Sequence, residues 1–457
     1  MFEINTFIVA FLICFPAVVM ASQKSTWLID YLFFVVALNR GVRRIVDYNN
    51  GYFNPLSLIS LTPIIVGGLA VLVVLVELNR RDHQFGHRTA NILYLYGGIV
   101  AYAFVIGFVN AKFGAVYALG DYIAPIGLMG YGALWSDDSA TVNRWCQSFA
   151  ASVLAVAVYG IWQFYTIPPW DAFWLVSVEM TGYMGTPEPT KMTLFSTMAE
   201  RGPVALYLSG GLTLLALRPQ TLGWLRWPSA AVVLYAMLLT YSRTSVIFAG
   251  LAIILYPMLN RGSGIAPVLA LSLLALIGGP ALMSRMPGQA SARVETIGTI
   301  QDDGSFKGRI RLLGIALRNS MSQPLGLGIG AGGLASRVQK ASKTAVLDST
   351  GYADTLATYG WIGFVIMMTV LYRLWRASSD LVAWEMDDAN VCIFRAWFIA
   401  GMAALFSGNW LAGASFFWLL AGYCLGRVDA MEEEVDEEEE FDDEDGEDEG
   451  SRYALDY

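Results

Sequence analysis

Apolar runs of roughly 17 to 25 residues recur along this chain from one end to the other. A helix of that length, rising 1.5 Å per residue, crosses a hydrocarbon layer about 30 Å thick. The run at residues 63–76 (PIIVGGLAVLVVLV) does not alternate between apolar and polar residues, which excludes a transmembrane barrel. The pattern therefore predicts an all-α, polytopic integral membrane protein.

Composition agrees, because 56% of the 457 residues are hydrophobic and 15% are charged, against about 25% charged in soluble domains. The apolar runs predict about twelve transmembrane helices, at residues 4–21, 56–78, 90–111, 113–135, 146–167, 200–217, 228–241, 244–259, 264–284, 355–373, 391–408 and 411–427. A thirteenth run, residues 27–39, is short and is followed by Arg40, Arg43 and Arg44. It is predicted to be a re-entrant or interfacial helix, with a full span as the alternative.

Basic residues in short loops orient the predicted spans. With a cytoplasmic C-terminus, alternation of the spans places most short, arginine-containing loops inside, as the positive-inside rule requires. Two longer loops then lie outside, a smaller one at 168–199 and a large periplasmic loop at 285–354. Twelve spans place the N-terminus inside, whereas a span at 27–39 would place it outside.

The end of the chain is a separate electrostatic unit. After Arg427 it holds 17 of the 38 acids and one of the 29 bases, so residues 1–427 carry a net charge of +7. Residues 1–427 are predicted to form the membrane domain. Residues 428–457 are predicted to be a disordered, acidic cytoplasmic tail, because this composition buries too little apolar surface to offset the ordering entropy. Two roles stay open for this tail, solvation or docking of a basic partner.

The sequence predicts no metal and no cofactor. Its two histidines, His83 and His87, fall in a predicted cytoplasmic loop, and there is no phosphate-binding loop of the Walker type. The glycine-dense stretch 326–333 follows no parallel strand and lacks a terminal Lys-Ser/Thr pair, so it is interpreted as a turn entering a packed loop. We expect no nucleic-acid partner.

Arginines near the predicted outer interface are the informative signal. Arg243 lies in a turn so tight (residues 241–245, YSRTS) that its charge is placed at or inside the interface, at a cost of a few kcal/mol. Such arginines usually line a cavity or pair with another group. Arg201 starts the preceding outer helix, where Glu200 can neutralise it or its side chain can snorkel to lipid headgroups.

The large loop contributes three more arginines. Residues 307–318 (KGRIRLLGIALR) predict an amphipathic helix on which Arg311 and Arg318 share a face and Arg309 points elsewhere. That face can anchor the loop on lipid phosphate or can bind a ligand. Several guanidinium groups beside a membrane cavity suit a lipid diphosphate, because arginine binds phosphate oxygens bidentately. The aromatic residues of loop 168–183 could stack on sugar rings or form an interfacial belt.

The order of several segments resembles the bacterial O-antigen ligase and Wzy-type polysaccharide polymerase superfamily. The resemblance covers roughly residues 185–375 and rests on five segments: 194–198 (LFSTM), 239–245 (LTYSRTS), 308–317 (GRIRLLGIAL), 323–330 (QPLGLGIG) and 348–363 (DSTGYADTLATYGWIG). It implies about twelve spans, both termini inside, a large periplasmic loop and metal-independent, inverting glycosyl transfer from an undecaprenyl-diphosphate-linked donor.

The resemblance also implies roles for particular residues. Arg243 and Arg309 match membrane-facing arginines of the family, which would hold the donor diphosphate and stabilise it as a leaving group. Arg201 matches less closely, and we place it with Arg311 and Arg318 among the substrate-binding candidates.

The chain departs from the ligase branch at a loop histidine that is proposed to activate the acceptor. Asp348-Ser-Thr stands where a His-Asn-like pair is expected, so Asp348 and Asp354 are the candidates for a general base, with Tyr352 as a hydrogen-bonding neighbour. Alternatively, Asp348 only pairs with a loop lysine such as Lys343. The missing histidine favours a polymerase of exopolysaccharide or O-antigen units over a ligase.

We therefore expect a multi-pass protein of the bacterial inner membrane, with its active face in the periplasm. Its expected partners are an undecaprenyl-diphosphate-linked oligosaccharide, membrane lipid and a chain-length regulator or other polysaccharide assembly proteins. The alternatives are an O-antigen ligase, a transporter or flippase of lipid-linked saccharides, and a non-catalytic assembly scaffold that uses the acidic tail.

Overall fold

The structure is a computed structural model that describes residues 4–54, 57–80, 85–198, 200–260, 304–330, 350–384, 388–406, 408–409, 411 and 415–452. Its elements in chain order are α1 (Ile4–Ser22), α2 (Trp27–Asn50), η1 (Leu58–Leu61), α3 (Thr62–Leu78), α4 (His87–Ala111), α5 (Phe113–Leu134), α6 (Ser139–Thr166), α7 (Pro169–Ser177), α8 (Thr181–Met184), η2 (Ser196–Met198), α9 (Arg201–Leu217), η3 (Gly223–Leu225), α10 (Arg226–Leu239), α11 (Arg243–Leu259), α15 (Gly304–Ser322), α17 (Gly351–Trp384), α18 (Ala389–Ala404) and α19 (Ser415–Arg452). Apart from one isolated bridge between Gly185 and Met192, the regular structure of these residues is helical.

The all-helical prediction is confirmed for the described residues. Eleven of the twelve predicted runs overlap a helix, and the remaining one, 264–284, lies outside the described residues. Among the described residues, five helical segments are long and apolar enough to cross a membrane: Ile4–Ser22, Leu58–Leu78, His87–Ala111, Ser139–Thr166 and Gly351–Trp384. The same part of the chain holds four shorter apolar helices, of 10–17 residues. The body is that of a membrane-embedded helical protein.

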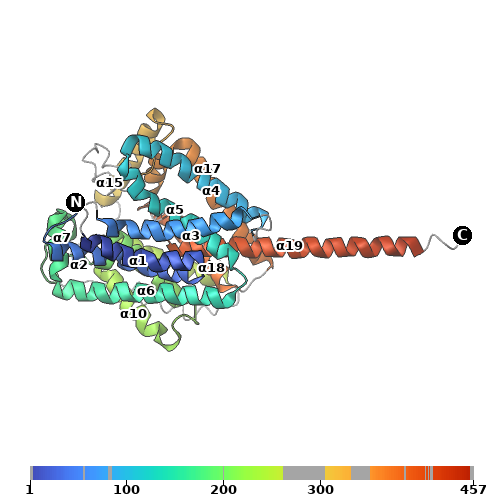
Figure 1. Cartoon of the computed structure of the whole chain (residues 1–457), viewed down its shortest axis with the longest axis horizontal. Helices are drawn as coiled ribbons and strands as arrows, with labels where there is room; N and C mark the ends of the chain where they lie inside the picture. Colours follow the sequence, from blue (N-terminus) through green and yellow to red (C-terminus); the bar gives the residue numbers. More distant parts are fainter. Residues whose placement is uncertain are drawn as a thin grey trace.

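The two ends of the helical body differ. Helices α1, α2, α3 and α6 run along its long axis, with the N-terminus at the same end as α7, whereas α19 extends beyond the opposite end (Figure 1). We call the end that carries α7, α8 and the turns before α9 and α11 the loop end. The end from which the acidic part of α19 leaves is the tail end.

Helix α5 forms the inner support of the bundle and packs against α3, α4 and α19. Its glycines allow this close approach, as small residues do between membrane helices. A Cβ added at Gly120 would lie 2.2 Å from Cγ1 of Ile64, and one added at Gly132 would lie 2.2 Å from the carbonyl oxygen of Leu419. The backbone of α5 is therefore held closely on two sides.

Helix α2 differs from the expected short interfacial segment, because it continues for 24 residues to Asn50. Arg43 and Arg44, which interrupt the apolar run, are buried and have partners within the protein. Arg43 donates a 2.6 Å hydrogen bond to the carbonyl oxygen of Asn54 and pairs with Asp47 at 3.3 Å. Buried cations are tolerated when such groups surround them, so the charges do not end the helix.

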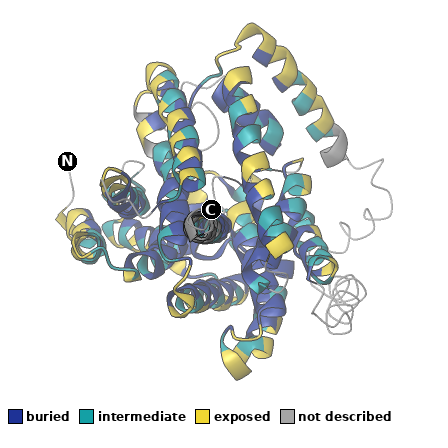
Figure 2. Cartoon of the chain, turned by 90° about the vertical axis from the view of Figure 1, so that its right-hand side faces the viewer, coloured by how far each residue is buried: buried dark blue, intermediate teal, exposed yellow. Residues whose placement is uncertain are grey.

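Helix α19 also differs from expectation, because it continues through the predicted disordered tail as far as Arg452. Its first half is apolar and central: Figure 2 shows α19 end-on, near the middle of the bundle, and Phe416, Phe417 and Trp418 are buried. A helix already nucleated by packing extends at little cost through glutamate, a good helix former.

Candidate functional site

A buried ion pair anchors the loop end. The Arg44 guanidinium of α2 lies 2.8 Å from the Asp171 carboxylate of α7, and both side chains are almost fully buried. Asp171 also accepts hydrogen bonds from Gln163 at 2.6 Å and Tyr159 at 2.8 Å. Burial raises the pKa of the Asp171 carboxyl, and Arg44 and the two donors oppose that shift. Because these contacts satisfy buried charges, they fix α7 against α2 and α6.

The same network holds the segment that leads into α9. The Gln163 amide oxygen accepts the backbone N–H of Ser196 at 2.7 Å, and Arg44 donates to the Ser196 carbonyl. The backbone N–H of Leu194 donates to the carbonyl of Leu239 at the end of α10, at 3.0 Å. These bonds place the start of α9 beside the α10–α11 turn.

Arg201 and Arg243, both predicted to bind substrate, are the first residues of α9 and α11. The two helices pack against each other, and both start at the loop end, since Leu194 before α9 is hydrogen-bonded to Leu239 at the end of α10. Both side chains are half-buried, and the Arg201 guanidinium carbon lies 4.0 Å from the centre of the Tyr183 ring. The N-terminus of a helix is the positive end of its dipole, so a cation in the first turn is unfavourable there and an anion is favoured. Two such helices therefore start side by side at the loop end, with Glu200 as the N-cap residue of α9.

Helix α15 carries the other predicted arginines. Arg309 is half-buried, whereas Arg311 and Arg318 are exposed, in agreement with the predicted difference between their faces. Ala316 of α15 and Ala353 of α17 belong to one buried apolar cluster, so α15 packs on the first turns of α17.

Of the two predicted bases, Asp348 lies outside the described residues and Asp354 lies in the first turn of α17. The Asn409 side-chain amide donates a hydrogen bond to the Asp354 carboxylate. Tyr352 does not share this contact, because its hydroxyl donates to the carbonyl oxygen of Met402 in α18 at 2.9 Å. Tyr352 thus attaches α17 to α18.

The glycine-dense stretch forms a packed turn over its described part, residues 326–330, as interpreted from the sequence. The backbone N–H of Leu327 donates to the Ala357 carbonyl at 2.7 Å, and that of Ile329 donates to the Ala103 carbonyl at 2.9 Å. Gly328 has φ of +80°, and a Cβ there would lie 2.0 Å from the backbone nitrogen of Gly107. The turn is thus inserted between α4 and α17, where α17 kinks at Gly360.

The structure adds polar residues that sequence reasoning did not select. Arg40 of α2 donates a 3.0 Å hydrogen bond to the carbonyl oxygen of Met198, three residues before Arg201. Asp121 of α5 is a further charged residue that lies within a predicted span. A carboxylate inside an apolar run was the available signal for this site.

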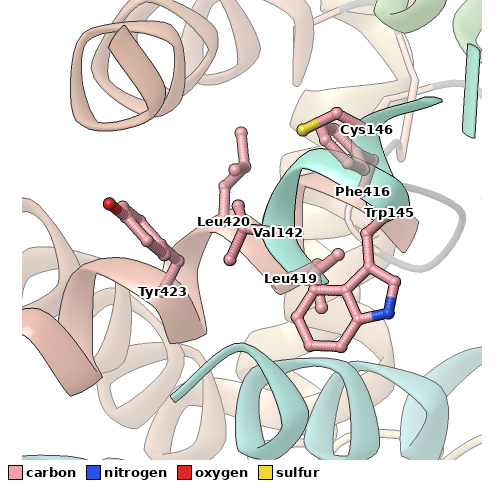
Figure 3. Close-up of a pocket in the computed structure, with 7 residues that line it drawn as sticks. All are labelled: Val142, Trp145, Cys146, Phe416, Leu419, Leu420 and Tyr423. Carbon is pink, nitrogen blue, oxygen red and sulfur yellow. The ribbon is translucent and has the colours of Figure 1, made fainter. Parts of the chain in front are cut away.

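The small pocket in Figure 3 lies elsewhere, between α6 and α19. Val142, Trp145, Cys146, Phe416, Leu419, Leu420 and Tyr423 line it. The Tyr423 hydroxyl group, which belongs to this lining, already donates a hydrogen bond to Asp388. Such a lining offers no group for glycosyl chemistry.

Within the described part of the chain, no three His, Cys, Asp or Glu side chains gather in a way that could hold a metal ion. Comparison with models of known protein families and with curated proteins gives no match for this chain. The functional argument therefore rests on the loop-end geometry.

Proposed function

We propose that this protein is a glycosyltransferase of the bacterial inner membrane that extends a polysaccharide at its periplasmic face. It would transfer a glycan from an undecaprenyl-diphosphate donor to a lipid-linked saccharide acceptor, without a metal and with inversion. The observation that carries the proposal is the placement of Arg201 and Arg243 at the starts of two packed helices. Their guanidinium groups and the helix N-termini together favour a multiply charged anion.

The diphosphate is the part of the donor that this arrangement suits. Arg201 and Arg243 would bind its oxygens bidentately and, with Arg309 of α15, stabilise the negative charge that develops as it leaves. Arg311 and Arg318, which are exposed on α15, would contact lipid phosphate or the donor. The turn of residues 241–245 lies at the end of apolar helices, where a carrier lipid can present its headgroup.

The transfer step would be a single displacement. The acceptor hydroxyl oxygen attacks the anomeric carbon of the donor sugar, the bond from that carbon to the diphosphate oxygen breaks, and undecaprenyl diphosphate departs. The hydroxyl proton passes to a carboxylate. Asp354 is the described candidate, since the Asn409 amide hydrogen-bonds its ionised form and α17 holds it at the loop end. Asp348 remains the second candidate.

The test is a chain-extension assay on protein purified in lipid nanodiscs. Lipid-linked saccharide units extracted from the host deleted for this gene serve as substrate, chelator is present, and gel and mass spectrometry resolve the products. Wild-type protein is expected to give a ladder of longer lipid-linked chains. Arg243→Ala should reduce the rate about 100-fold or more, because removing a charge-stabilising donor typically has that effect.

Arg80→Ala is the matched control, because Arg80 is an exposed arginine at the tail end that pairs with Glu77. This variant should extend chains at the wild-type rate. Absence of any ladder from folded wild-type protein, or equal rates for Arg243→Ala and wild type, would refute the proposal.

The kink of α17 favours one alternative. Helices broken around irregular backbone are typical of transporters, and α17 breaks at Gly360 beside the inserted turn 323–330. A flippase would move the same lipid-linked units between the leaflets of a liposome without lengthening them. A ligase would instead transfer finished chains to a lipid A core acceptor, which the extension assay distinguishes when that acceptor is added.

A further inference from the structure

Helix α15 exposes an apolar stripe beside the surface that packs on α17. Ile310, Leu317 and Met321 are 57%, 39% and 76% exposed, respectively. At about 100° per residue, these three side chains lie within roughly 40° of one another around the helix. Ala316 and Ser320, which are buried, lie about a quarter-turn away. Exposed apolar side chains that share one helix face mark a surface for lipid or for another protein.

Two arginines flank this apolar stripe on the side away from α17. Arg311 and Arg318 are exposed and lie about 90° from the stripe, on the face opposite the buried Ala316. An amphipathic helix on a membrane surface has this arrangement, because its apolar side chains enter the acyl boundary while its basic side chains reach the phosphate groups. The positive charge beside the stripe therefore favours a bilayer of acidic lipid over an uncharged apolar partner.

The level of α15 along α17 agrees with the edge of a bilayer. Ala316 belongs to one buried cluster with Ala353, in the first turn of α17. From Ala353 to the exposed Arg373 the chain advances by about 20 residues, or about 30 Å of helix, and residues 355–372 carry no charge. This length matches the thickness of a hydrocarbon layer. Helix α15 therefore lies where the uncharged part of α17 ends.

The orientation of α15 also suits a membrane surface. Figure 2 is a view along the long axis of the body, and α15, at its upper right, lies across that view, whereas α19 is seen end-on. The turn that follows α15 fixes this end of the helix. The backbone N–H of Leu327 donates to the Ala357 carbonyl at 2.7 Å, and the Tyr102 hydroxyl of α4 donates to the Leu325 carbonyl at 2.9 Å. The helix is thus held across the direction of the long apolar helices.

We propose that α15 is an interfacial helix that docks on the loop-end leaflet of an acidic phospholipid bilayer. Its apolar stripe enters the acyl boundary, and Arg311 and Arg318 bind lipid phosphate. This docking goes beyond the proposed glycosyl transfer, because it needs no saccharide and assigns a membrane surface to α15. It holds Arg309, on the same helix, at the depth of a lipid headgroup.

A fluorescent label on Met321→Cys tests what covers the stripe. Asn319→Cys is the matched control, because Asn319 is also exposed but lies on the opposite side of α15. Wild type gives the labelling background, since its own cysteines are buried or half-buried. In nanodiscs of phosphatidylcholine and phosphatidylglycerol, lipids with a nitroxide on the acyl chain should quench the Met321 label roughly threefold more than the Asn319 label. Aqueous iodide should quench the two labels in the reverse order, and Ile310→Cys should behave as Met321→Cys does.

The phosphate contact is tested by adding Arg311→Gln and Arg318→Gln to the labelled Met321→Cys protein. Before these substitutions, nitroxide carried by phosphatidylglycerol should quench about twofold more than nitroxide carried by phosphatidylcholine, because the two arginines concentrate anionic lipid beside the helix. The substituted protein should lose this difference. Equal quenching by the two lipids before the substitutions, or an unchanged difference after them, overturns the phosphate contact.

The docking itself has separate outcomes that overturn it. A Met321 label that iodide quenches as strongly as the Asn319 label shows that water covers the stripe. A Met321 label shielded from both iodide and nitroxide lipid shows that protein covers it instead. Quenching of both labels by nitroxide lipid alone places α15 inside the hydrocarbon layer. Each of these results excludes an interfacial helix, and none of them depends on whether the protein extends saccharide chains.

Discussion

The loop end and the tail end both hold arginines at helix starts, but their surroundings differ. At the tail end, Arg88 in the first turn of α4 is 2.7 Å from Asp380 and also pairs with Glu432, while Asp429 accepts the backbone N–H groups of Arg88 and Thr89. Carboxylates from α17 and α19 therefore neutralise that helix start. At the loop end, Arg201 stacks on Tyr183 at the start of α9.

A second tail-end arginine completes the contrast. Arg226 donates to the carbonyl oxygens of Leu215 and Ala216 in the last turn of α9. A cation at the C-terminus of a helix agrees with the helix dipole, whereas Arg201 at the N-terminus of the same helix opposes it. One helix thus carries a stabilising arginine at its tail end and, at its loop end, an arginine suited to bind an anion.

The largest effect should come from breaking the buried pair that supports the loop end. Asp171→Ala leaves the Arg44 charge buried without its carboxylate, which costs about 3–5 kcal/mol of unfolding free energy. Chemical unfolding in detergent, followed by tryptophan fluorescence, measures the loss. The double variant Arg44→Met/Asp171→Leu, which removes both charges, should recover much of it. Wild-type stability for Asp171→Ala would show that the pair does not anchor the loop end.

The two arginines of α9 provide a direct test of the contrast. Arg201→Ala should lower chain extension roughly 30-fold, equivalent to about 2 kcal/mol in the transition state, with an unchanged unfolding midpoint. Arg226→Ala should do the reverse and lower stability by about 1 kcal/mol, because it removes hydrogen bonds to two carbonyl groups, while activity is kept. The chain-extension rate and the unfolding midpoint are measured for both variants. If both variants lower the stability and neither lowers the chain-extension rate, the loop end has no special role in activity.

A smaller effect is expected at the start of α4. Asp429→Ala removes the carboxylate that caps this helix from outside, and a lost cap typically costs about 1 kcal/mol. Asp429→Asn, which can still accept the hydrogen bonds, should cost less. Unfolding midpoints of the two variants measure the difference. Identical unfolding midpoints for wild type and Asp429→Ala would show that the Asp429 carboxylate does not stabilise the start of α4.

The smallest effect should follow from deleting residues 435–457. The deletion keeps Glu432 and Asp429 and removes the part of α19 that projects from the body (Figure 1). Chain extension in nanodiscs should stay within about twofold of wild type, because the proposed site lies at the other end. A scaffold that works through its acidic tail would instead lose function on this deletion, which polymer production in cells would show.

Some elements were predictable because their cause is local. The long apolar runs gave the helices, and the amphipathic pattern of residues 307–318 gave α15 with its two exposed arginines. Arg201 was predicted at the start of a helix, where the structure places it, and Arg243 was predicted in the turn before a helix and is the first residue of α11. Neither prediction needed knowledge of contacts between distant segments.

Other elements depend on contacts between distant segments. Arg44 looked like the end of a short apolar run, but Asp171 and the Ser196 carbonyl, more than 120 residues away, allow it to be buried within α2. The helical course of α19 beyond Asp429 follows from its packed first half.

The sequence alone determined that the chain is helical and apolar, because helix formation and hydrophobicity depend on neighbouring residues and on the solvent. It also determined that the end of the chain is acidic. The tertiary structure decided which charges stabilise the fold and which gather at the loop end. The physical reason is that the energy of a charge depends on its burial and on its partners, and both are set by segments that lie far apart in the sequence.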